Sequence, residues 1–204
     1  MNTRNTHMLR IIPAVLMALA LCACAVSRVD PMSIPLAYKT NPKSAIVLGG
    51  LPCSAISQIQ VTDARAEKTL GTRVHESKPL KATVTAGTDP AAWAQDGVQT
   101  FLGQHGVTVQ GTGPKLLVSL DAMNTVESIW HRSSYDAHLN LTGQLQSSSG
   151  KTCWKDSVDG ASGNYGYSGG VPNYQETLNG ALDAAIAKMA QSQGFKDAMC
   201  HCTN

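Results

Sequence analysis

The stretch YDAHLNLTGQLQ, residues 135–146, decides the fold because apolar and polar side chains alternate along it almost without interruption. One face carries Tyr135, Ala137, Leu139, Leu141 and Leu145. The other face carries Asp136, His138, Asn140, Thr142, Gln144 and Gln146. A period of two residues is typical of a strand that packs one face on a core and exposes the other to water. Residues 135–146 are therefore expected to form a half-buried antiparallel strand.

Further strands are predicted on both sides of this stretch. The SSG sequence at 148–150 indicates a hairpin turn, after which residues 152–158 return. Upstream, residues 116–129 alternate over their centre, with Val118, Leu120 and Ala122 on one face. Shorter or weaker strand signals lie at 56–66, around Val74, around Val84 and at 107–110.

Two helices accompany these strands. Asp89 and Pro90 are typical of an N-cap followed by proline in the first turn, and Gly106 suits the end of that helix. Its expected apolar face is Trp93, Val98, Phe101, Leu102 and His105. Residues 160–174 are rich in Gly, Ser and Tyr and predict no regular element.

The second helix is expected to begin at Asn173, with Glu176 completing a capping box, and to end at Gly194. Its apolar stripe is Leu178, Leu182, Ala185, Ile186 and Met189, and the short tail after it is expected to dock through Phe195 and Met199. The fold class predicted from these elements is α+β, an antiparallel sheet of about four to five strands with two helices packed on one face.

The first 24 residues have the pattern of an export signal with a lipid-attachment site. Arg4 and Arg10 accompany an apolar run at 11–21, which is shorter than the about 20 residues that a transmembrane helix needs. The run ends in LCAC at 21–24, which resembles the lipobox of bacterial lipoproteins and predicts cleavage before Cys24 and acylation of that cysteine. Ala25, in place of aspartate, favours the outer membrane over retention at the inner membrane, by resemblance to Gram-negative sorting rules. An ordinary soluble signal peptide is the alternative.

This pattern divides the chain into three parts. We predict a lipoprotein signal peptide at 1–23, a lipidated Cys24 with an extended tether at 24–50, and a single α+β domain at 51–204. The tether is predicted from Pro31, Pro35 and Pro42 among polar residues without periodicity.

Charge and motifs exclude several functions. Without Arg4 and Arg10 the mature chain has 14 basic and 14 acidic residues, so no basic surplus favours nucleic acid as a partner. Phosphate-loop and dinucleotide fingerprints are absent, and we expect no cofactor.

Four further cysteines, Cys53, Cys153, Cys200 and Cys202, predict disulfides in an oxidising periplasm. If the last helix runs back beside the strand at 152–158, its about 20 residues rise about 30 Å and return the chain to Cys153. We therefore predict that Cys153 bonds to Cys200 or to Cys202, which leaves Cys53 for the other. A soft-metal site at Cys200, His201 and Cys202 is the alternative.

The layout resembles the YajG-like family of uncharacterised bacterial lipoproteins. The resemblance rests on DAR at 63–65 followed by EKTLG at 67–71, HGV at 105–107, the paired strands 116–129 and 135–146, and the helix 174–193. It implies a small lipoprotein facing the periplasm and supplies no catalytic residue. The added cysteines and the Gly/Tyr-rich loop at 161–171 depart from the family pattern.

Two patches are candidate interaction sites, each with a plainer reading as an exposed loop. Tyr165, Tyr167 and Tyr174, interleaved with Gly and Ser, have the composition of adaptable binding loops for an envelope protein or a glycan. The triplet 130–132, WHR, ends a strand and forms a second candidate patch with Tyr135 and His138.

One further motif, GYSGG at 166–170, matches the pattern of a nucleophile elbow around Ser168. Asp183, Asp197 and His201 follow in a permissible order, but a parallel sheet of alternating strands and helices is not predicted.

These observations leave three hypotheses from different classes. The leading one is a non-enzymatic binding or assembly accessory of the cell envelope, attached to the membrane through acylated Cys24. A carrier of a small ligand or lipid, with an apolar pocket between sheet and helices, is the second. A serine hydrolase that uses Ser168 is the third.

Overall fold

A computed structural model of the 204-residue chain describes residues 28–40, 51 and 53–202. The predicted signal peptide, Cys24 and Ala25 lie outside the described residues, as do parts of the predicted tether.

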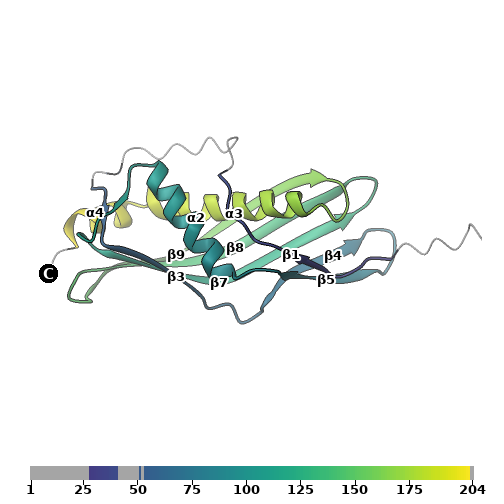
Figure 1. The fold of residues 1–204 in the computed structure, drawn as a ribbon, viewed down its shortest axis with the longest axis horizontal. Coiled ribbons are helices and arrows are strands. Elements are labelled where there is room, and N and C mark those ends of the chain that lie inside the picture. Colours follow the sequence, from purple (N-terminus) through teal and green to yellow (C-terminus); the bar gives the residue numbers. More distant parts are fainter. Residues whose placement is uncertain (1–27, 41–50, 52, 203–204) are drawn as a thin grey trace, which may run out of the picture.

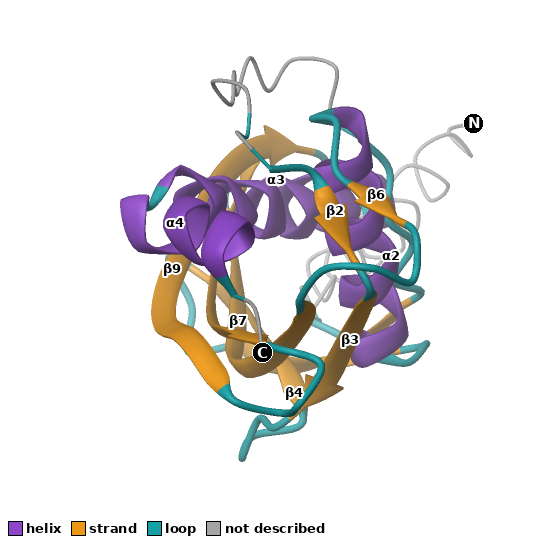
Figure 2. Ribbon diagram, turned by 90° about the vertical axis from the view of Figure 1, so that its left-hand side faces the viewer, coloured by secondary structure: helices purple, strands orange, loops and turns teal. Residues whose placement is uncertain are grey.

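Seven strands form one curved mixed sheet (Figures 1 and 2). Six of them follow the order β1 (Met32–Ile34), β5 (Lys81–Ala86), β4 (Thr69–His75), β7 (Lys115–Ile129), β8 (Ser133–Gln146) and β9 (Thr152–Gly166). The seventh, β3 (Gln58–Asp63), pairs with the first part of β7, whereas β4 pairs with its last part. A separate short ladder joins β2 (Ala55–Ile56) to β6 (Thr108–Val109).

The expected sheet of four to five antiparallel strands is wrong in size and in direction. The pairs β1–β5, β3–β7 and β4–β7 are parallel, whereas β4–β5, β7–β8 and β8–β9 are antiparallel. The hairpins were predictable because their strands are neighbours in sequence. The parallel pairs join segments far apart in the chain, for which local periodicity carries no information.

Strand β8 has the two faces that its sequence predicts. All five residues of the expected apolar face are buried, and the polar residues opposite them are half-buried or exposed. The neighbouring strand β7 differs, because a bulge shifts its register between Leu120 and Ala122. Val118 and Leu120 are buried as expected, but Ala122 is exposed, and beyond the bulge Met123, Thr125 and Glu127 face inward.

Three helices are described, one more than expected. Helix α2 (Pro90–Gln104) has the predicted cap, in which Asp89 Oδ1 accepts from the Ala91 N–H at 2.9 Å. Helix α3 (Val171–Gln191) begins after Gly170 and not at Asn173, and Glu176 accepts from the Asn164 side chain in place of a capping box. The chain then forms α4 (Gln193–His201), so Gly194 lies inside a helix that buries Phe195 and Met199.

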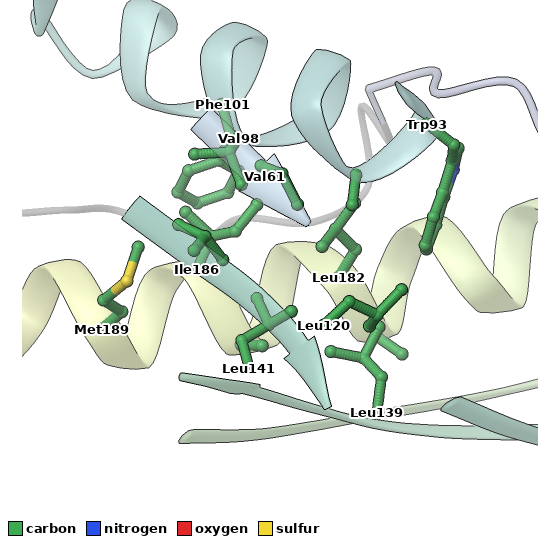
Figure 3. Packing of buried hydrophobic residues seen from close by; sticks show 14 of the residues in the cluster. Val61, Trp93, Val98, Phe101, Leu120, Leu139, Leu141, Leu182, Ile186 and Met189 are labelled. Carbon is green, nitrogen blue, oxygen red and sulfur yellow. The ribbon is translucent and has the colours of Figure 1, made fainter. Parts of the chain in front are cut away.

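The core lies between the concave face of the sheet and helices α2 and α3 (Figure 3). Every residue of the apolar stripe predicted for α3 is fully buried. Leu182, Ile186 and Met189 from α3 meet Leu139 and Leu141 from β8 in this layer.

Residues 28–40 correct the predicted tether at 24–50, because this part is built into the domain. Strand β1 extends the sheet beside β5, and Ile34 and Leu36 are buried in the core. The following residues cross both helices. Tyr38 donates a hydrogen bond to Asp183 Oδ1 on α3 at 2.7 Å, and Thr40 accepts one from Gln104 on α2.

The four cysteines of the domain form two disulfides, Cys53–Cys200 and Cys153–Cys202. This is one of the two pairings that the sequence left open. Both bonds hold α4, which lies at the end of the molecule that faces the viewer in Figure 2. None of the described helices is long and apolar enough to cross a membrane.

Candidate functional site

One end of the elongated domain collects three turns and the point where the described chain begins (Figure 1). The turns are β4–β5, β7–β8 and β9–α3. They are joined by hydrogen bonds: the Glu76 N–H donates to the Ile129 carbonyl, and Arg73 Nη1 donates to the Asp30 carbonyl at 2.8 Å. We call this region, residues 28–31, 75–81, 129–133 and 165–169, the aromatic end. Helix α4 and both disulfides lie at the opposite end.

Large apolar side chains are exposed at the aromatic end. Among the described residues, four such side chains are exposed, and three of them are here: Trp130 at 52%, Tyr165 at 75% and Tyr167 at 91%. They border a hollow of about 410 Å³ whose other lining residues include His131 and Arg132. The Trp130 and His131 rings meet edge to face at 4.9 Å. Exposed aromatic residues gathered around a hollow are typical of contact surfaces.

A buried carboxylate lies beneath this surface. Glu127 is fully buried at the end of β7, and its Oε2 accepts from Arg73 Nε at 2.5 Å and from the Tyr174 hydroxyl at 2.7 Å. Its Oε1 accepts from the Gly169 N–H at 2.7 Å. A buried charge is tolerated only when it is paired and hydrogen-bonded, and Glu127 satisfies both conditions.

The same cluster holds the β9–α3 turn that carries Tyr167. The Tyr135 hydroxyl donates to the Tyr167 carbonyl, accepts from the Gly170 N–H at 3.1 Å, and lies 3.2 Å from Glu127 Oε1. Arg73 Nη2 donates to Ser168 Oγ at 3.3 Å. The turn is thus fixed from below through its backbone, while the Tyr167 side chain is left in water.

The cluster shifts the pKa of its acidic groups in a consistent way. Burial raises the pKa of the Glu127 carboxyl, but hydrogen bonds from Arg73, Gly169 and Tyr174 outweigh burial and bring the pKa below its ordinary value. Burial, together with the hydrogen bond to Glu127, raises the pKa of Tyr174. Glu127 therefore stays ionised and Tyr174 stays a hydrogen-bond donor at neutral pH.

The structure brings the two predicted interaction patches together and divides each of them. Trp130, His131 and Arg132 meet Tyr165 and Tyr167 around one hollow. Tyr174 is fully buried in the core, so its place in a binding loop is wrong. Tyr135 is buried as well, and His138 lies apart, on the outer face of β8.

The loop predicted at 160–174 is a second correction, because β9 continues to Gly166 and α3 begins at Val171. Glycine is needed here for packing. A Cβ atom on Gly160 would lie 1.9 Å from the Ala181 carbonyl oxygen of α3.

Ser168 lies between a strand and a helix, as the nucleophile-elbow pattern requires, but its surroundings differ from that pattern. Its Oγ accepts from the guanidinium of Arg73, which is not a base. Asp183 accepts from Tyr38 in the core, and His201 Nδ1 lies 2.9 Å from the Asp197 carbonyl on α4, at the other end of the molecule.

Cys200 and Cys202 are both engaged in disulfides, so their thiolates do not flank His201 as metal ligands. Within residues 28–40, 51 and 53–202, no three His, Cys, Asp or Glu side chains come together in a metal-binding arrangement.

A second hollow, of about 500 Å³, lies at the bulge of β7 on the outer face of the sheet. Its polar lining includes Arg65, Asp121, His138, Asn140 and Asp159. Two of these groups bind each other, because Asn140 Nδ2 donates to Asp159 Oδ1 at 2.9 Å. Two others are bound by neighbours outside the lining: Asp121 Oδ1 accepts from Ser119, and Arg65 Nε donates to Asp63. The carrier hypothesis requires an apolar pocket on the other face, in the layer where the described core side chains pack between the sheet and the helices.

Comparison with known proteins identifies similar folds and no relative by sequence. The sequence matches no protein-family model and no curated protein. The fold is similar to the crystal structure of protein XCC0632 from Xanthomonas campestris, of family DUF330, with 10% identity and a TM-score of 0.44 over 83% of this chain and 94% of that one. It is also similar to a minor lipoprotein from Acinetobacter baumannii, with 10% identity and a TM-score of 0.35 over 72% and 92% of the two chains.

Proposed function

We propose that the protein is a lipoprotein of the cell envelope, anchored by acylated Cys24 on the periplasmic side of the outer membrane, and that it works as a non-enzymatic binding or assembly accessory. Its contact surface is the aromatic end. The observation that carries this proposal is the collection of Trp130, Tyr165 and Tyr167 on one surface that a buried cluster holds in place.

The organisation of the aromatic end supports binding more than chemistry. The buried ionisable groups beneath it, Arg73 and Glu127, pair with each other, and the hydrogen bonds that Glu127 accepts hold its pKa low. A general base needs a pKa near neutral pH, and a nucleophile needs a base beside it. The group beside the Ser168 hydroxyl is the guanidinium of Arg73, which is not a base. The cluster therefore serves to position the turn beneath Tyr167.

Anchoring is tested by separating the inner and outer membranes of cells that make the full chain or the Cys24→Ala variant. We expect the wild-type protein in the outer-membrane fraction and the variant outside it. Equal distribution of both proteins would remove the lipid anchor from the proposal. Labelling by a fluorophosphonate that is lost in Ser168→Ala would instead favour the hydrolase.

A further inference from the structure

We propose that the aromatic end rests on the lipid surface itself, with Trp130, Tyr165 and Tyr167 in the headgroup region of the bilayer that holds the acyl chains of Cys24. This inference rests on the proposed lipid attachment and names the partner of the contact surface. It fixes the orientation of the domain, with α4 and the disulfides pointing away from the membrane.

The length of chain between the anchor and the fold is the first argument. Only four residue steps separate Cys24 from Arg28, where the described chain begins. Covalent geometry limits four steps to at most about 14 Å, whatever their conformation. Residues 28–31 are part of the aromatic end, and the Asp30 carbonyl accepts from Arg73 directly beneath it. An anchored domain therefore keeps this end close to the bilayer.

The chemistry of the surface is the second argument. Trp and Tyr are enriched at membrane–water interfaces because each combines an apolar ring with a polar group that stays hydrated. Tyr167 and Tyr165 are the two most exposed of the large apolar side chains described, and they lie on the end that the short connection holds at the membrane.

Charge is the third argument. The aromatic end carries Arg28, Lys78, Lys81 and Arg132 against Asp30 and Glu76. The mature chain as a whole has equal numbers of basic and acidic residues. A local basic excess on a neutral protein is attracted to anionic headgroups and orients the molecule.

Fluorescence quenching tests the contact. The full-length protein, processed and lipidated in its host, is reconstituted into vesicles of phosphatidylethanolamine and phosphatidylglycerol, with and without bromine on the acyl chains near the headgroup. We expect brominated lipid to quench part of the tryptophan emission, and that part to be missing from Trp130→Phe. The other two tryptophans lie elsewhere: Trp93 is buried in the core, and Trp154 packs on Phe195 of α4.

Two variants separate docking from mere proximity. Tyr165→Ser with Tyr167→Ser is expected to reduce the quenching of Trp130. Val109→Ser removes the fourth exposed large apolar side chain among the described residues, which lies on β6, away from the aromatic end, and is expected to leave the quenching unchanged.

Three results would overturn parts of the account. A processed protein without lipid on Cys24 that does not float with vesicles defeats the anchor and, with it, this inference. If the protein is lipidated and floats with vesicles, but its tryptophan emission is quenched no more than that of Trp130→Phe, the lipid anchor stands and only the docking of the aromatic end is refuted. If brominated lipid does not quench the Trp130 emission but soluble peptidoglycan fragments shift it, the aromatic end binds a glycan and not the lipid surface.

Discussion

Replacing Glu127 with alanine tests the cluster that holds the aromatic end. The change leaves Arg73, which is 8% exposed, without its carboxylate, and it removes the acceptor of the Tyr174 hydroxyl and the Gly169 N–H. Breaking a buried ion pair from one side costs about 3–5 kcal/mol. A domain is stable by only about 5–15 kcal/mol, so this is a large share of the total.

Urea unfolding of the oxidised protein measures the loss. With a slope of about 2 kcal/mol per molar urea, the unfolding midpoint is expected to fall by about 2 M. The Gly169 and Gly170 amides should also exchange faster with solvent, because their acceptors are lost or displaced. Glu76→Ala, an exposed carboxylate at the same end, is the matched control and should change stability by at most about 0.5 kcal/mol.

The pH dependence has a definite sign. Since the pKa of Glu127 is lower in the folded state, its contribution is present above the unfolded pKa of about 4.3 and is lost as pH falls through the folded value. The stability difference between wild type and Glu127→Gln should therefore shrink in acid. A cost below about 1 kcal/mol for Glu127→Ala at pH 7 would refute the reasoning, because the pair would then contribute no more than an exposed one.

Three further predictions concern other parts of the fold. Burial raises the pKa of Asp183, against a smaller opposing effect of the Tyr38 hydrogen bond. The wild type should therefore lose stability as pH rises through the raised pKa, and Asp183→Asn, which does not titrate, should become more stable relative to wild type between pH 4 and pH 8, as measured by unfolding. Gly160→Ala should destabilise the protein by about 3 kcal/mol or more, because the added Cβ meets the α3 backbone. Gly103→Ala in α2, whose Cβ meets nothing within 4 Å, should stabilise it by up to about 1 kcal/mol. A change of the same sign for both variants would contradict the close packing of β9 on α3. Replacing both Cys153 and Cys202 with serine removes a disulfide between residues 49 positions apart and should lower the free energy of unfolding by about 2–4 kcal/mol, measured by thermal unfolding. Adding reductant to this variant should lower its stability further, because the Cys53–Cys200 disulfide is then reduced as well.

The elements with the strongest local periodicity could be predicted from sequence. Strand β8 and the apolar stripe of α3 are set by side chains a few residues apart, and both have the expected buried faces. The Asp89 cap of α2 is equally local. Strand β1 was missed because its three residues lie between two prolines, and only its pairing with β5, some 50 residues away, makes it a strand.

The buried cluster was missed for a single reason, the bulge in β7. Continuing the alternation from Val118 and Leu120 through Ala122 places Glu127 on the solvent face. The register shift between Leu120 and Ala122 turns it inward, opposite Tyr135 of β8. No glycine or proline marks the bulge. The pairing of β4 with β7 places Arg73 beside Glu127, but this parallel pair joins distant segments and cannot be predicted from local periodicity.

The central claim is that Cys24 holds the aromatic end at the membrane, and the mass of the N-terminal peptide tests its foundation most directly. The mature protein is purified from membranes in detergent, digested and examined by mass spectrometry. The account predicts a peptide that begins at Cys24 and carries acyl chains on that residue. A peptide that begins elsewhere, or an unmodified Cys24, would contradict it.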